Sequence, residues 1–485
     1  MPGAKFNTSL VVGLTFVATL GGLLFGWDTA VISGAVSSID AYFIDPLGLS
    51  ETARSSLSGW TISSALVGCI IGAAVAGWLS TAIGRKGGLI VAAVLFLAGS
   101  IGSAVPEFGF GTVGQMGPHA LPQFIFYRIV GGVGVGVASM LSPLYIAEIS
   151  PSAIRGRLVS FNQLAIVGGI LLVYFLNWYI ASLGDEAWLK SVGWRWMLAS
   201  EAIPSVVFLV LLALVPDTPR WLVLRGRNDE ALAQLKRVTD ESDARTILED
   251  IQRTLEVRSG KLFSFGVGVI VVGILMSVFQ QFVGINAVLY YAPLMFHNMG
   301  ASTDTALLQT VVVGAANVAF TVVAIVTVDK WGRKPLLIAG ALVMAVAMIA
   351  LGCLFNAQAV GIGALIAVVV YIAGFAFSWG PVTWVLLAEM FPNSIKGKGL
   401  GIAVAAQWVA NWVVSTSFKV LDGSSALNNL FHHGFAYWIY GVMSLLAALF
   451  VWRSVPETKG KSLEAIQDLW GKGAHTRAAS SPTAG

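Results

Sequence analysis

Charged side chains are scarce in this sequence. Only 11% of its 485 residues are Asp, Glu, Lys or Arg, 56% are hydrophobic, and the mean hydropathy is +0.80. Soluble globular proteins are about 25% charged, so the composition excludes a soluble enzyme and predicts a polytopic membrane protein. The net charge is only +4 and no basic block stands out, which argues against a nucleic-acid partner.

Cysteine is also scarce, because the chain carries only Cys69 and Cys353, in apolar segments far apart in the sequence. This placement argues against a disulfide framework, and both thiols are expected to be buried. The sequence shows no cluster of metal ligands and no pair of nucleophile and base. We therefore expect no metal and no cofactor, and a membrane enzyme is the least favoured function.

Long apolar runs are abundant, and a membrane-spanning helix needs about 20 such residues. The first run contains Asp28 and has no cleavage site after a short core, so it is expected to be a membrane helix rather than a cleaved signal. Twelve candidate spans follow one another along the chain: 9–40, 56–80, 88–105, 123–147, 159–181, 196–215, 265–294, 306–328, 335–356, 361–388, 399–419 and 434–453.

Between the sixth and seventh spans, segment 217–262 carries nine Lys or Arg and nine Asp or Glu with helical periodicity. The predicted organisation is a six-helix bundle over 1–216, a cytoplasmic helical linker over 217–262, a second six-helix bundle over 263–455 and a tail over 456–485. The short loops on one side carry nine Lys or Arg against four on the other, so both termini are expected in the cytoplasm.

The two predicted bundles share three short motifs in the same order, at offsets of 248, 241 and 240 residues. Such constant offsets predict two parallel repeats, an organisation that places substrate between the repeats near the bilayer midplane. The matching pairs are AIGRKGGL (82–89) with KWGRKPLL (330–337), AEISPSAIRGR (147–157) with AEMFPNSIKGK (388–398), and PDTPRWL (216–222) with PETKGKSL (456–463).

The stretch QQFVGINAVLYYAP in the seventh span is polar although its surroundings are apolar. Gln280, Gln281, Asn286 and Tyr290 fall within about three helical turns, and Gly284 is expected to loosen the helix between them. Amide side chains in hydrocarbon are costly unless they are hydrogen-bonded. An uncharged set of donors and acceptors suits a neutral polyhydroxylated ligand, and contact between helices is the alternative.

Asp28 lies near the middle of the first span. An ionisable residue within the membrane is a functional candidate by default. Burial favours the neutral acid and a nearby cation favours the carboxylate, so a partner that moves would make Asp28 bind and release a proton. Arg128, early in the fourth span, is the expected partner, and a static salt bridge between helices is the alternative.

The loop motifs resemble those of the major facilitator superfamily, and finer signatures resemble its sugar porter family. These signatures are PDTPRWL, GRK, GRKP, PETKGKSL, QQFVGINAVLYYAP and SWGPVTWVLLAEMFP. Within the family, FGWDTAVISG, VSFNQLAIVGG and VAAQWVANW are most similar to bacterial D-xylose:proton symporters. The resemblance covers nearly the whole chain. It implies an all-α membrane protein of twelve transmembrane helices in two six-helix repeats.

The resemblance also implies roles for single residues. Asp28 and Arg128 match the proton-coupling pair of proton-driven porters, whereas facilitators have a neutral residue in place of the Asp. Amides offer donors and acceptors to sugar hydroxyls, and tryptophan faces offer flat contact to a sugar ring. The residues matching sugar-binding positions are Phe25, Gln163, Gln280, Gln281, Asn286, Tyr290, Asn317, Trp384, Gln407 and Trp408, with Trp27 as a further candidate from the first span.

Two positions depart from the family pattern. Ile170 stands where some xylose symporters have a second Gln in the fifth span, and facilitators of the family also have Ile there. One hydrogen bond to the ligand is therefore expected to be missing, which leaves pentose and hexose open. Lys396 stands where the family usually has Arg, and Lys offers a point charge instead of a two-pronged contact with a carboxylate.

Charged residues at helix ends recur in both halves and are expected to form a cytoplasmic gate that separates when the halves rock. They are Arg85, Glu148, Arg155, Arg333, Glu389 and Lys396. Gly380 and Pro381 are expected to weaken the tenth helix. The pairs Gly22–Gly26, Gly68–Gly72 and Gly132–Gly136 have the GxxxG spacing of closely packed helices.

The leading hypothesis is a monomeric symporter that couples a proton to a monosaccharide, D-xylose or a similar pentose or hexose, by alternating access in the bacterial inner membrane. A facilitative uniporter with a structural Asp28 is the first alternative. A sugar sensor of the same fold is the second, although sensors usually have long cytoplasmic tails, and here 15 residues follow Trp470.

Overall fold

The computed structural model describes residues 6–151, 154–256, 262–263, 265–392 and 395–459. Throughout these residues every regular element is a helix, and no strand occurs among them. The predicted all-α class is therefore confirmed. A helix satisfies its backbone N–H and C=O groups within its own segment, which hydrocarbon requires of a spanning chain.

The apolar segments before the linker form long helices. The first ends earlier than predicted, because Asn177 Nδ2 donates to the carbonyl of Val31 at 3.1 Å and the chain then tightens into short turns. The long helices are α1 (Thr8–Val31), α3 (Glu51–Ala82), α4 (Gly84–Ala104), α5 (Leu121–Ile149), α6 (Arg155–Ala181) and α8 (Trp194–Ala199) continued by α9 (Ala202–Leu214). The short elements are η1 (Ile32–Gly34), α2 (Val36–Ile39), η2 (Asp40–Ile44), η3 (Asp45–Leu47), η4 (Gly117–Ala120), α7 (Glu186–Trp188) and η5 (Leu189–Gly193).

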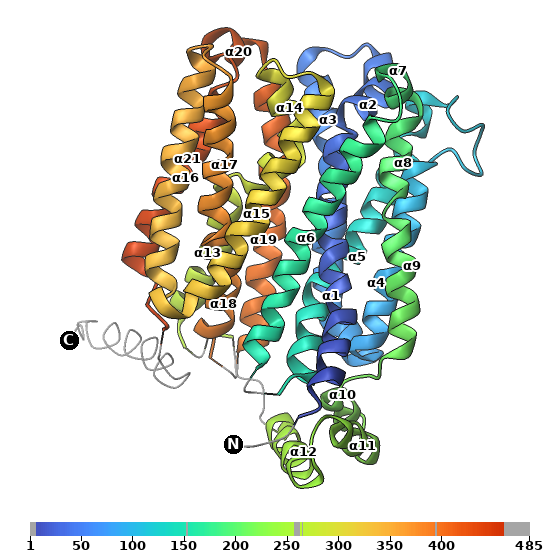
Figure 1. Cartoon of the computed structure of the whole chain (residues 1–485), viewed down its shortest axis with the longest axis vertical. Coiled ribbons are helices and arrows are strands. Elements are labelled where there is room, and N and C mark those ends of the chain that lie inside the picture. The colour runs from blue at the N-terminus through green and yellow to red at the C-terminus, as the bar shows by residue number, and fades with distance from the viewer. Residues whose placement is uncertain (1–5, 152–153, 257–261, 264, 393–394, 460–485) are drawn as a thin grey trace, which may run out of the picture. The chain divides into compact units, whose positions relative to one another are not determined.

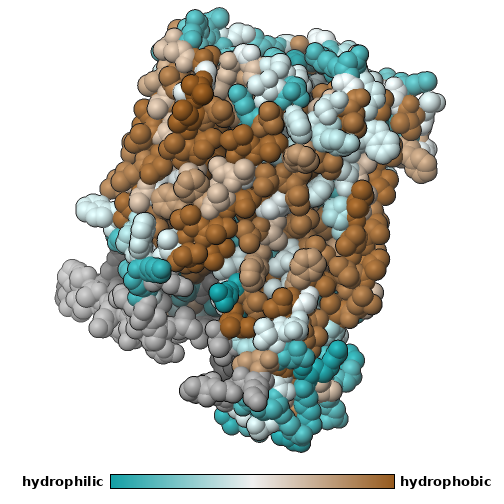
Figure 2. Space-filling view, viewed as in Figure 1, coloured by the Kyte–Doolittle hydropathy of each residue, from teal (hydrophilic) through white to brown (hydrophobic). Residues whose placement is uncertain are grey.

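The charged segment after α9 folds into three helices, as predicted: α10 (Pro219–Leu224), α11 (Asn228–Val238) and α12 (Glu241–Glu256). Pro219 starts α10, where its missing N–H has no helical partner to lose. The N–H of Asn7 donates to the carbonyl of Val238 at 2.8 Å, so α11 is tied to the start of α1. In Figure 2 these helices are hydrophilic, whereas hydrophobic residues cover the side of α8 and α9.

The remaining chain forms a second series of helices, and two of its predicted spans are broken into two helices each. The elements are α13 (Val267–Phe282), α14 (Ile285–Asn298), α15 (Thr303–Trp331), α16 (Arg333–Asn356), α17 (Ile362–Ala376), α18 (Trp379–Met390), α19 (Lys396–Asp422), α20 (Ser425–Phe431) and α21 (Phe435–Ser454) (Figure 1).

Eleven helical segments among the described residues are long and apolar enough to cross a membrane. The eleventh predicted span is not one of these eleven segments, although α19 covers it with a 27-residue helix. Its apolar character is interrupted by Gln407, Asn411 and Lys419, all buried. Polar residues inside a membrane helix are tolerated where they face protein rather than lipid, so α19 is expected to be an interior helix.

Contacts divide the chain into two compact units. Unit 1 comprises Met1–Val257, Ala287–Val318 and Ser415–Ser425, and unit 2 comprises Arg258–Asn286, Ala319–Val414 and Ala426–Gly485. These spatial units differ from the four sequence segments predicted above, whose bounds stay a prediction. Unit 1 includes α14 and parts of α15 and α19, which belong to the second predicted repeat.

Small residues bring the helices of unit 1 into backbone contact, as the GxxxG spacing predicted. A Cβ added at Gly26 of α1 would lie 1.9 Å from the carbonyl oxygen of Ile166 in α6. One added at Gly132 of α5 would lie 1.9 Å from the carbonyl oxygen of Ala65 in α3. Both contacts are impossible for any residue with a side chain, so these glycines set the spacing of α1, α3, α5 and α6.

Candidate functional site

An acid and a base face each other inside unit 1. Asp28 of α1 and Arg128 of α5 are both 4% exposed, and Arg128 Nη1 lies 2.7 Å from Asp28 Oδ1. The predicted pairing is thus present. The contact is single, and the Arg128 Nε atom has no hydrogen-bond partner among the described residues. A Cβ added at Gly131 would lie 3.7 Å from Asp28 Oδ1, so α5 presents bare backbone to the carboxylate.

A second buried acid stands beside this pair and was missed by the sequence analysis. Glu201, at the start of α9, is 2% exposed and interacts electrostatically with both Asp28 and Arg128. Its Oε1 atom has no hydrogen-bond partner in the part of the chain that the structure describes. Two acids and one arginine therefore share one buried site. The signal was available, since Glu201 lies inside the predicted sixth span.

Four of the predicted sugar-binding amides form one hydrogen-bonded chain in unit 2. Gln407 Nε2 donates to Gln280 Oε1 at 2.6 Å, and Gln281 Nε2 donates to the same oxygen at 3.3 Å. Asn286 Nδ2 in turn donates to Gln281 Oε1 at 2.5 Å. The Gln407 Oε1 atom is buried without a partner among the described residues. Such an orphaned carbonyl is unfavourable by about 1–3 kcal/mol, and a ligand hydroxyl could satisfy it.

Two helix breaks shape this amide cluster, which consists of Gln280, Gln281, Asn286 and Gln407. The seventh span breaks between α13 and α14 at Gly284, whose φ of 96° suits glycine, as predicted. Val283, at the break, accepts a hydrogen bond from Tyr371 OH at 2.8 Å. Discontinuous membrane helices commonly mark transporter binding sites.

The tenth span breaks as well, three residues before the predicted weak point at Gly380 and Pro381. The break falls at Phe377 and Ser378, and α18 then begins at Trp379 with Gly380 and Pro381 in its first turn. The reason is that a proline ring clashes with the carbonyl four residues before it, here that of Phe377. Gln280 Nε2 donates to the carbonyl of Trp379 at 2.9 Å, so the cluster is tied to this break.

The other predicted sugar residues divide between the two units. Trp384 and Trp408 belong to unit 2, and Trp408 is 5% exposed. Phe25, Gln163, Tyr290 and Asn317 belong to unit 1. Their roles in sugar binding stay predictions.

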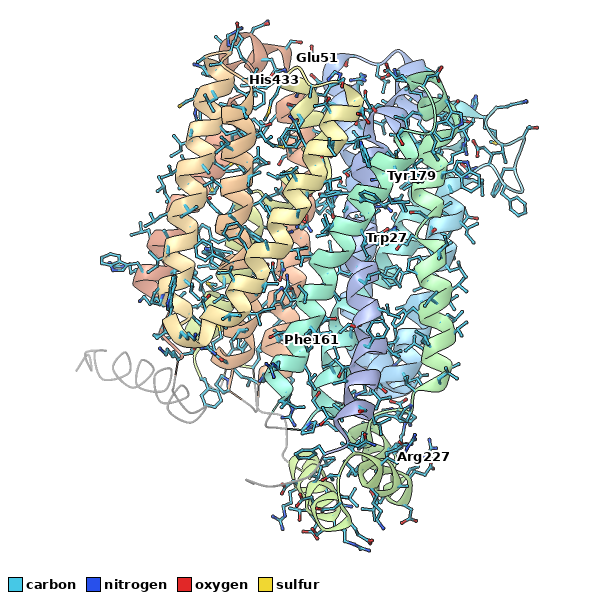
Figure 3. All side chains as sticks on the ribbon, in the orientation of Figure 1. Trp27, Glu51, Phe161, Tyr179, Arg227 and His433 are labelled. Carbon is cyan, nitrogen blue, oxygen red and sulfur yellow. The ribbon has the colours of Figure 1, made fainter. Side chains whose placement is uncertain are left out.

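Two further residues near these positions have defined surroundings. The Trp27 Nε1 atom donates to Ser200 Oγ at 3.1 Å, which ties α1 to the junction of α8 and α9 (Figure 3). This bond gives Trp27 a packing role in unit 1. Ile170, the departure from the xylose symporter pattern, is 3% exposed.

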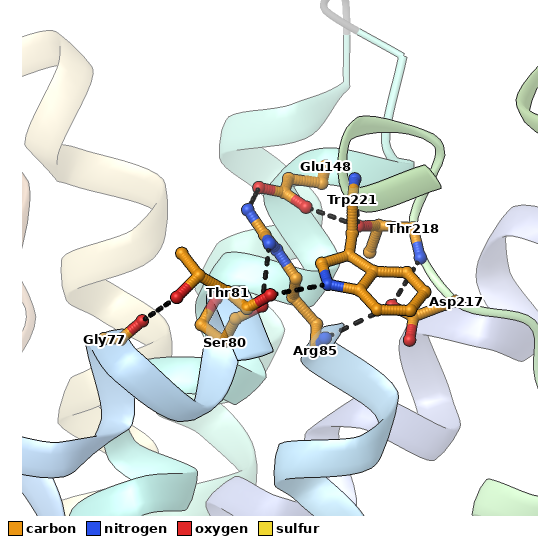
Figure 4. A network of polar contacts seen from close by, with 8 residues as sticks. All are labelled: Gly77, Ser80, Thr81, Arg85, Glu148, Asp217, Thr218 and Trp221. Atoms are coloured by element: carbon orange, nitrogen blue, oxygen red, sulfur yellow. Dashed lines mark hydrogen bonds and ion pairs between the residues drawn. The ribbon is translucent and has the colours of Figure 1, made fainter. Parts of the chain in front are cut away.

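Arg85 organises a polar network at the linker end of unit 1 (Figure 4). Its Nη2 lies 2.7 Å from Glu148 Oε1, and Thr218 Oγ1 donates to the other oxygen of that carboxylate at 2.6 Å. The N–H of Arg85 donates to Asp217 Oδ1 at 3.1 Å. Gly84 permits this approach, since an added Cβ would lie 2.0 Å from Asp217 Oδ2.

Unit 2 repeats the same network at the equivalent positions. Arg333 Nη2 lies 2.8 Å from Glu389 Oε1, and Thr458 Oγ1 donates to Glu389 Oε2 at 2.6 Å. The N–H groups of Arg333 and Lys334 donate to the Glu457 carboxylate at 3.1 and 3.0 Å. The internal repeat predicted from the motifs is therefore present in three dimensions.

Four of the six predicted gate residues thus pair within their own unit, Arg85 with Glu148 and Arg333 with Glu389. The networks also recruit Asp217, Thr218, Glu457 and Thr458, which were not predicted to act although the PDT and PET motifs that contain them were recognised. Arg155 is exposed and donates to the carbonyl of Ser150 at 3.4 Å. A gate across the halves stays a prediction for all six residues, Lys396 included.

The two carboxylates that accept backbone N–H groups have pKa values shifted in opposite directions. Both lie outside the membrane-spanning segments. Burial raises the pKa of Asp217 above its usual value, and the N–H groups of Thr218, Lys86 and Arg85 offset this only in part. Burial acts in the same direction on Glu457, but the backbone N–H groups around it hold its pKa below the usual value.

A buried ion pair joins stretches of the two repeats at the end of unit 1 opposite the linker. Lys419 Nζ of α19 lies 3.0 Å from Asp40 Oδ2, and Ser58 Oγ donates to Asp40 Oδ1 at 2.5 Å. In the same unit Tyr174 OH of α6 donates to the carbonyl of Leu289 in α14 at 2.7 Å. Parts of the second repeat are therefore bonded to the first at this end.

Comparison with known proteins gives close relatives. A family model described as sugar (and other) transporter matches residues 14–470. The chain is 55% identical to the D-xylose-proton symporter of Escherichia coli strain K12 over 475 residues, covering 96% of this chain and 97% of that protein. It is 48% identical over 471 residues to the glucose facilitated diffusion protein of Zymomonas mobilis, covering 96% and 99%.

The structure is also similar to that of the MFS (major facilitator superfamily) proton:xylose symporter XylE bound to 6-bromo-6-deoxy-D-glucose. The TM-score is 0.84 at 55% identity, covering 96% of this chain and 100% of that one. This similarity confirms the predicted fold of twelve membrane helices in two six-helix repeats. The family model and these relatives match nearly the whole chain. The protein therefore belongs to the sugar transporter family of the major facilitator superfamily.

Proposed function

We propose that the protein is a symporter that couples a proton to a monosaccharide by alternating access. The observation that carries the proposal is the buried triad of Asp28, Arg128 and Glu201, in which two acids share one arginine. The relatives named as a D-xylose-proton symporter and a proton:xylose symporter support it.

The triad provides a site for a proton that responds to its surroundings. In the structure Arg128 contacts Asp28 through a single ion pair. Protonation of Asp28 removes that attraction and frees Arg128 to turn to Glu201, whose Oε1 atom is otherwise unpaired among the described residues. The exchange of partners gives the proton a direct effect on the packing of α1, α5 and α9.

The sugar is proposed to bind at the amide cluster, and Gln163, Tyr290, Asn317 and Trp384 stay predicted sugar-binding residues on the strength of the sequence motifs alone. The amide hydrogen bonds converge on one acceptor, because Gln280 Oε1 accepts from both Gln407 and Gln281, and Gln281 accepts from Asn286. The unpartnered carbonyl of Gln407 then accepts from a sugar hydroxyl. Uncharged donors and acceptors discriminate for a neutral ligand and against ionic solutes.

We further propose that the linker face is cytoplasmic and that the protein acts as a monomer in the inner membrane. The bias of Lys and Arg between short loops supports this orientation. In that orientation the Asp40–Lys419 ion pair would hold the outer side closed. The networks around Arg85 and Arg333 would brace each half near the cytoplasm and contribute the gate when the halves approach.

Asp28→Asn tests the coupling in reconstituted vesicles. We expect proton-driven accumulation of xylose to be lost while exchange of labelled sugar at equal pH is retained, because the amide cluster is intact. The matched control is Asp304→Asn, which removes the same charge from an exposed position at the start of α15. Accumulation by Asp28→Asn at the control level would refute the coupling role.

D-xylose is the proposed substrate, since the 55% identical relative is named for it. Competition of xylose, glucose, galactose and arabinose for binding to the purified protein tests this. Gln280→Ala and Gln407→Ala are expected to abolish binding without unfolding the protein. Normal affinity in either variant would remove that residue from the site.

Facilitated diffusion is the second candidate, favoured by the 48% identity to a glucose facilitated diffusion protein. The measurement that separates the two is the external pH of a weakly buffered vesicle suspension. Symport predicts alkalinisation on sugar addition, and facilitated diffusion predicts none.

A further inference from the structure

The loop between α4 and η4, residues 105–116, has an unusual composition for an exposed segment. From Phe108 to Pro118 the chain carries no charged residue. The side chains of Phe108, Phe110 and Val113 are 75%, 65% and 46% exposed. Figure 1 shows this loop extending away from the helices of unit 1 beside α8. Exposed aromatic residues gathered in this way mark an interaction surface.

The base of the loop is nevertheless held firmly. Glu107 is fully buried and forms a two-pronged ion pair with Arg195, with Nη2 to Oε1 at 2.6 Å and Nη1 to Oε2 at 2.9 Å. Tyr42 OH donates to the same carboxylate at 2.7 Å, as does the N–H of Gly114 at 3.3 Å. The N–H of Phe110 donates to the Glu107 carbonyl at 2.9 Å. The phenylalanines therefore project from a fixed base.

Arg195 also sets the level of the loop along the membrane normal. Its Nη1 atom donates to the carbonyl of Ala104, where the loop begins, at 2.9 Å. The next residue, Trp196, is 62% exposed, and tryptophan is enriched where membrane meets water. Ile203, about 10 Å further along the same apolar span, is 73% exposed. The loop thus leaves the helices at the level of the interface, beside a lipid-exposed surface.

We propose that loop 105–116 is a membrane anchor that inserts Phe108 and Phe110 into the boundary between headgroups and acyl chains. The leaflet is the one at the end of the bundle opposite the linker, and the Glu107–Arg195 pair fixes the loop at the required depth. Aromatic rings favour this boundary, and the uncharged sequence of the loop allows them to reach it. The proposal depends on the membrane location of the chain and is independent of the transport chemistry.

The immersion depth of nitroxide labels tests the proposal. The full chain, with the exposed Cys353 replaced by Ala, is reconstituted in vesicles of phosphatidylethanolamine and phosphatidylglycerol. Single labels are placed through Phe108→Cys and Phe110→Cys, with Ile203→Cys as the lipid control and Glu249→Cys on the exposed side of α12 as the water control. We expect the loop labels to collide with oxygen rather than with a water-soluble nickel chelate, as at the lipid control. Nickel accessibility equal to the water control would overturn the proposal.

Two further outcomes concern the Glu107–Arg195 pair at the base of the loop and the identity of the surface that the loop contacts. Glu107→Gln, with Tyr42→Phe as a milder variant, is expected to raise the nickel accessibility of the label at position 110 several-fold, because the base loosens. Unchanged nickel accessibility in both variants would overturn the role of the Glu107–Arg195 pair in fixing the depth of the loop. Dipolar broadening of this label that grows with protein density would show docking on a second copy and would overturn the lipid partner.

Discussion

Unit 1 contains two buried arginine–carboxylate pairs that differ in how completely they are satisfied. The Glu107–Arg195 pair is two-pronged, and its carboxylate accepts further bonds from Tyr42 and Gly114. Arg195 also lies 4.4 Å from the centre of the Trp194 ring. The Asp28–Arg128 pair has a single contact, an unpartnered Nε among the described residues, and Glu201 beside it.

We propose that this difference separates a structural pair, Glu107–Arg195, from a proton-coupling pair, Asp28–Arg128. A saturated ion pair, whose hydrogen-bonding groups are all satisfied, has one stable arrangement, because any change of protonation would break several bonds at once. An unsaturated pair with a spare acid has two arrangements of similar energy, which is what a proton carrier needs. Burial alone does not distinguish them, since all four side chains are less than a tenth exposed. The number of hydrogen bonds that each pair makes distinguishes them.

Breaking the saturated pair should have the largest effect on stability. Arg195→Met leaves Glu107 buried without its cation, which is unfavourable by about 3–5 kcal/mol. Unfolding midpoints in detergent measure the loss, and exchange activity of the folded fraction should be unchanged. The double variant Arg195→Met with Glu107→Gln should recover part of the stability. A midpoint equal to the parent in the single variant would contradict the structural role.

The unsaturated pair should tolerate the loss of its acid better. In Asp28→Asn, Glu201 can become the counter-ion of Arg128, so we expect a stability change of about 1 kcal/mol or less, near that of exposed pairs. Adding Glu201→Gln leaves Arg128 without any carboxylate and should lower stability by more than the sum of the two single changes. A double-mutant cycle measures this coupling free energy between Asp28 and Glu201. Simple additivity would mean that the two acids do not share the arginine.

Glu201→Gln alone should affect coupling rather than binding. The variant keeps the Asp28–Arg128 contact but removes the second acceptor, so accumulation should fall several-fold while the affinity for sugar stays near that of the parent. Uptake under an imposed pH gradient and equilibrium binding are the two measurements. A parallel loss of binding would place Glu201 in the sugar site instead.

The smallest expected effect is on the pH dependence of stability. Burial would raise the pKa of Glu107, but its hydrogen bonds with Arg195 and Tyr42 outweigh this and lower the pKa. A carboxylate with a lowered folded-state pKa contributes stability above its unfolded value of about 4.3 and loses it as the pH falls through the folded value. Unfolding midpoints should therefore drop at acid pH less steeply in Glu107→Gln than in the parent. Equal slopes would exclude this contribution.

Much of this arrangement could be predicted because hydrocarbon restricts what a chain can do. Apolar runs of sufficient length must be helices, and the motif offsets required two repeats, which the networks of Arg85 and Arg333 bear out. Gly284 and Pro381 indicated where helices break, although the break associated with Pro381 falls earlier in the chain, at Phe377. Within the twelve predicted spans the acids are Asp28, Asp40 and Glu201, and each lies in a buried polar site. Only the first was recognised.

The sequence by itself determined the helical class and the repeats, because these follow from apolar run length and repeated motifs, while the resemblance of its motifs indicated the family and pointed to Asp28 and Arg128. Tertiary structure alone decided which charges are saturated. Arg195 lies just before the predicted sixth span and Lys419 is the last residue of the predicted eleventh span, yet each is buried against a carboxylate from a distant segment. Hydrogen-bond partners are set by the packing of helices far apart in sequence, and no local pattern encodes that packing.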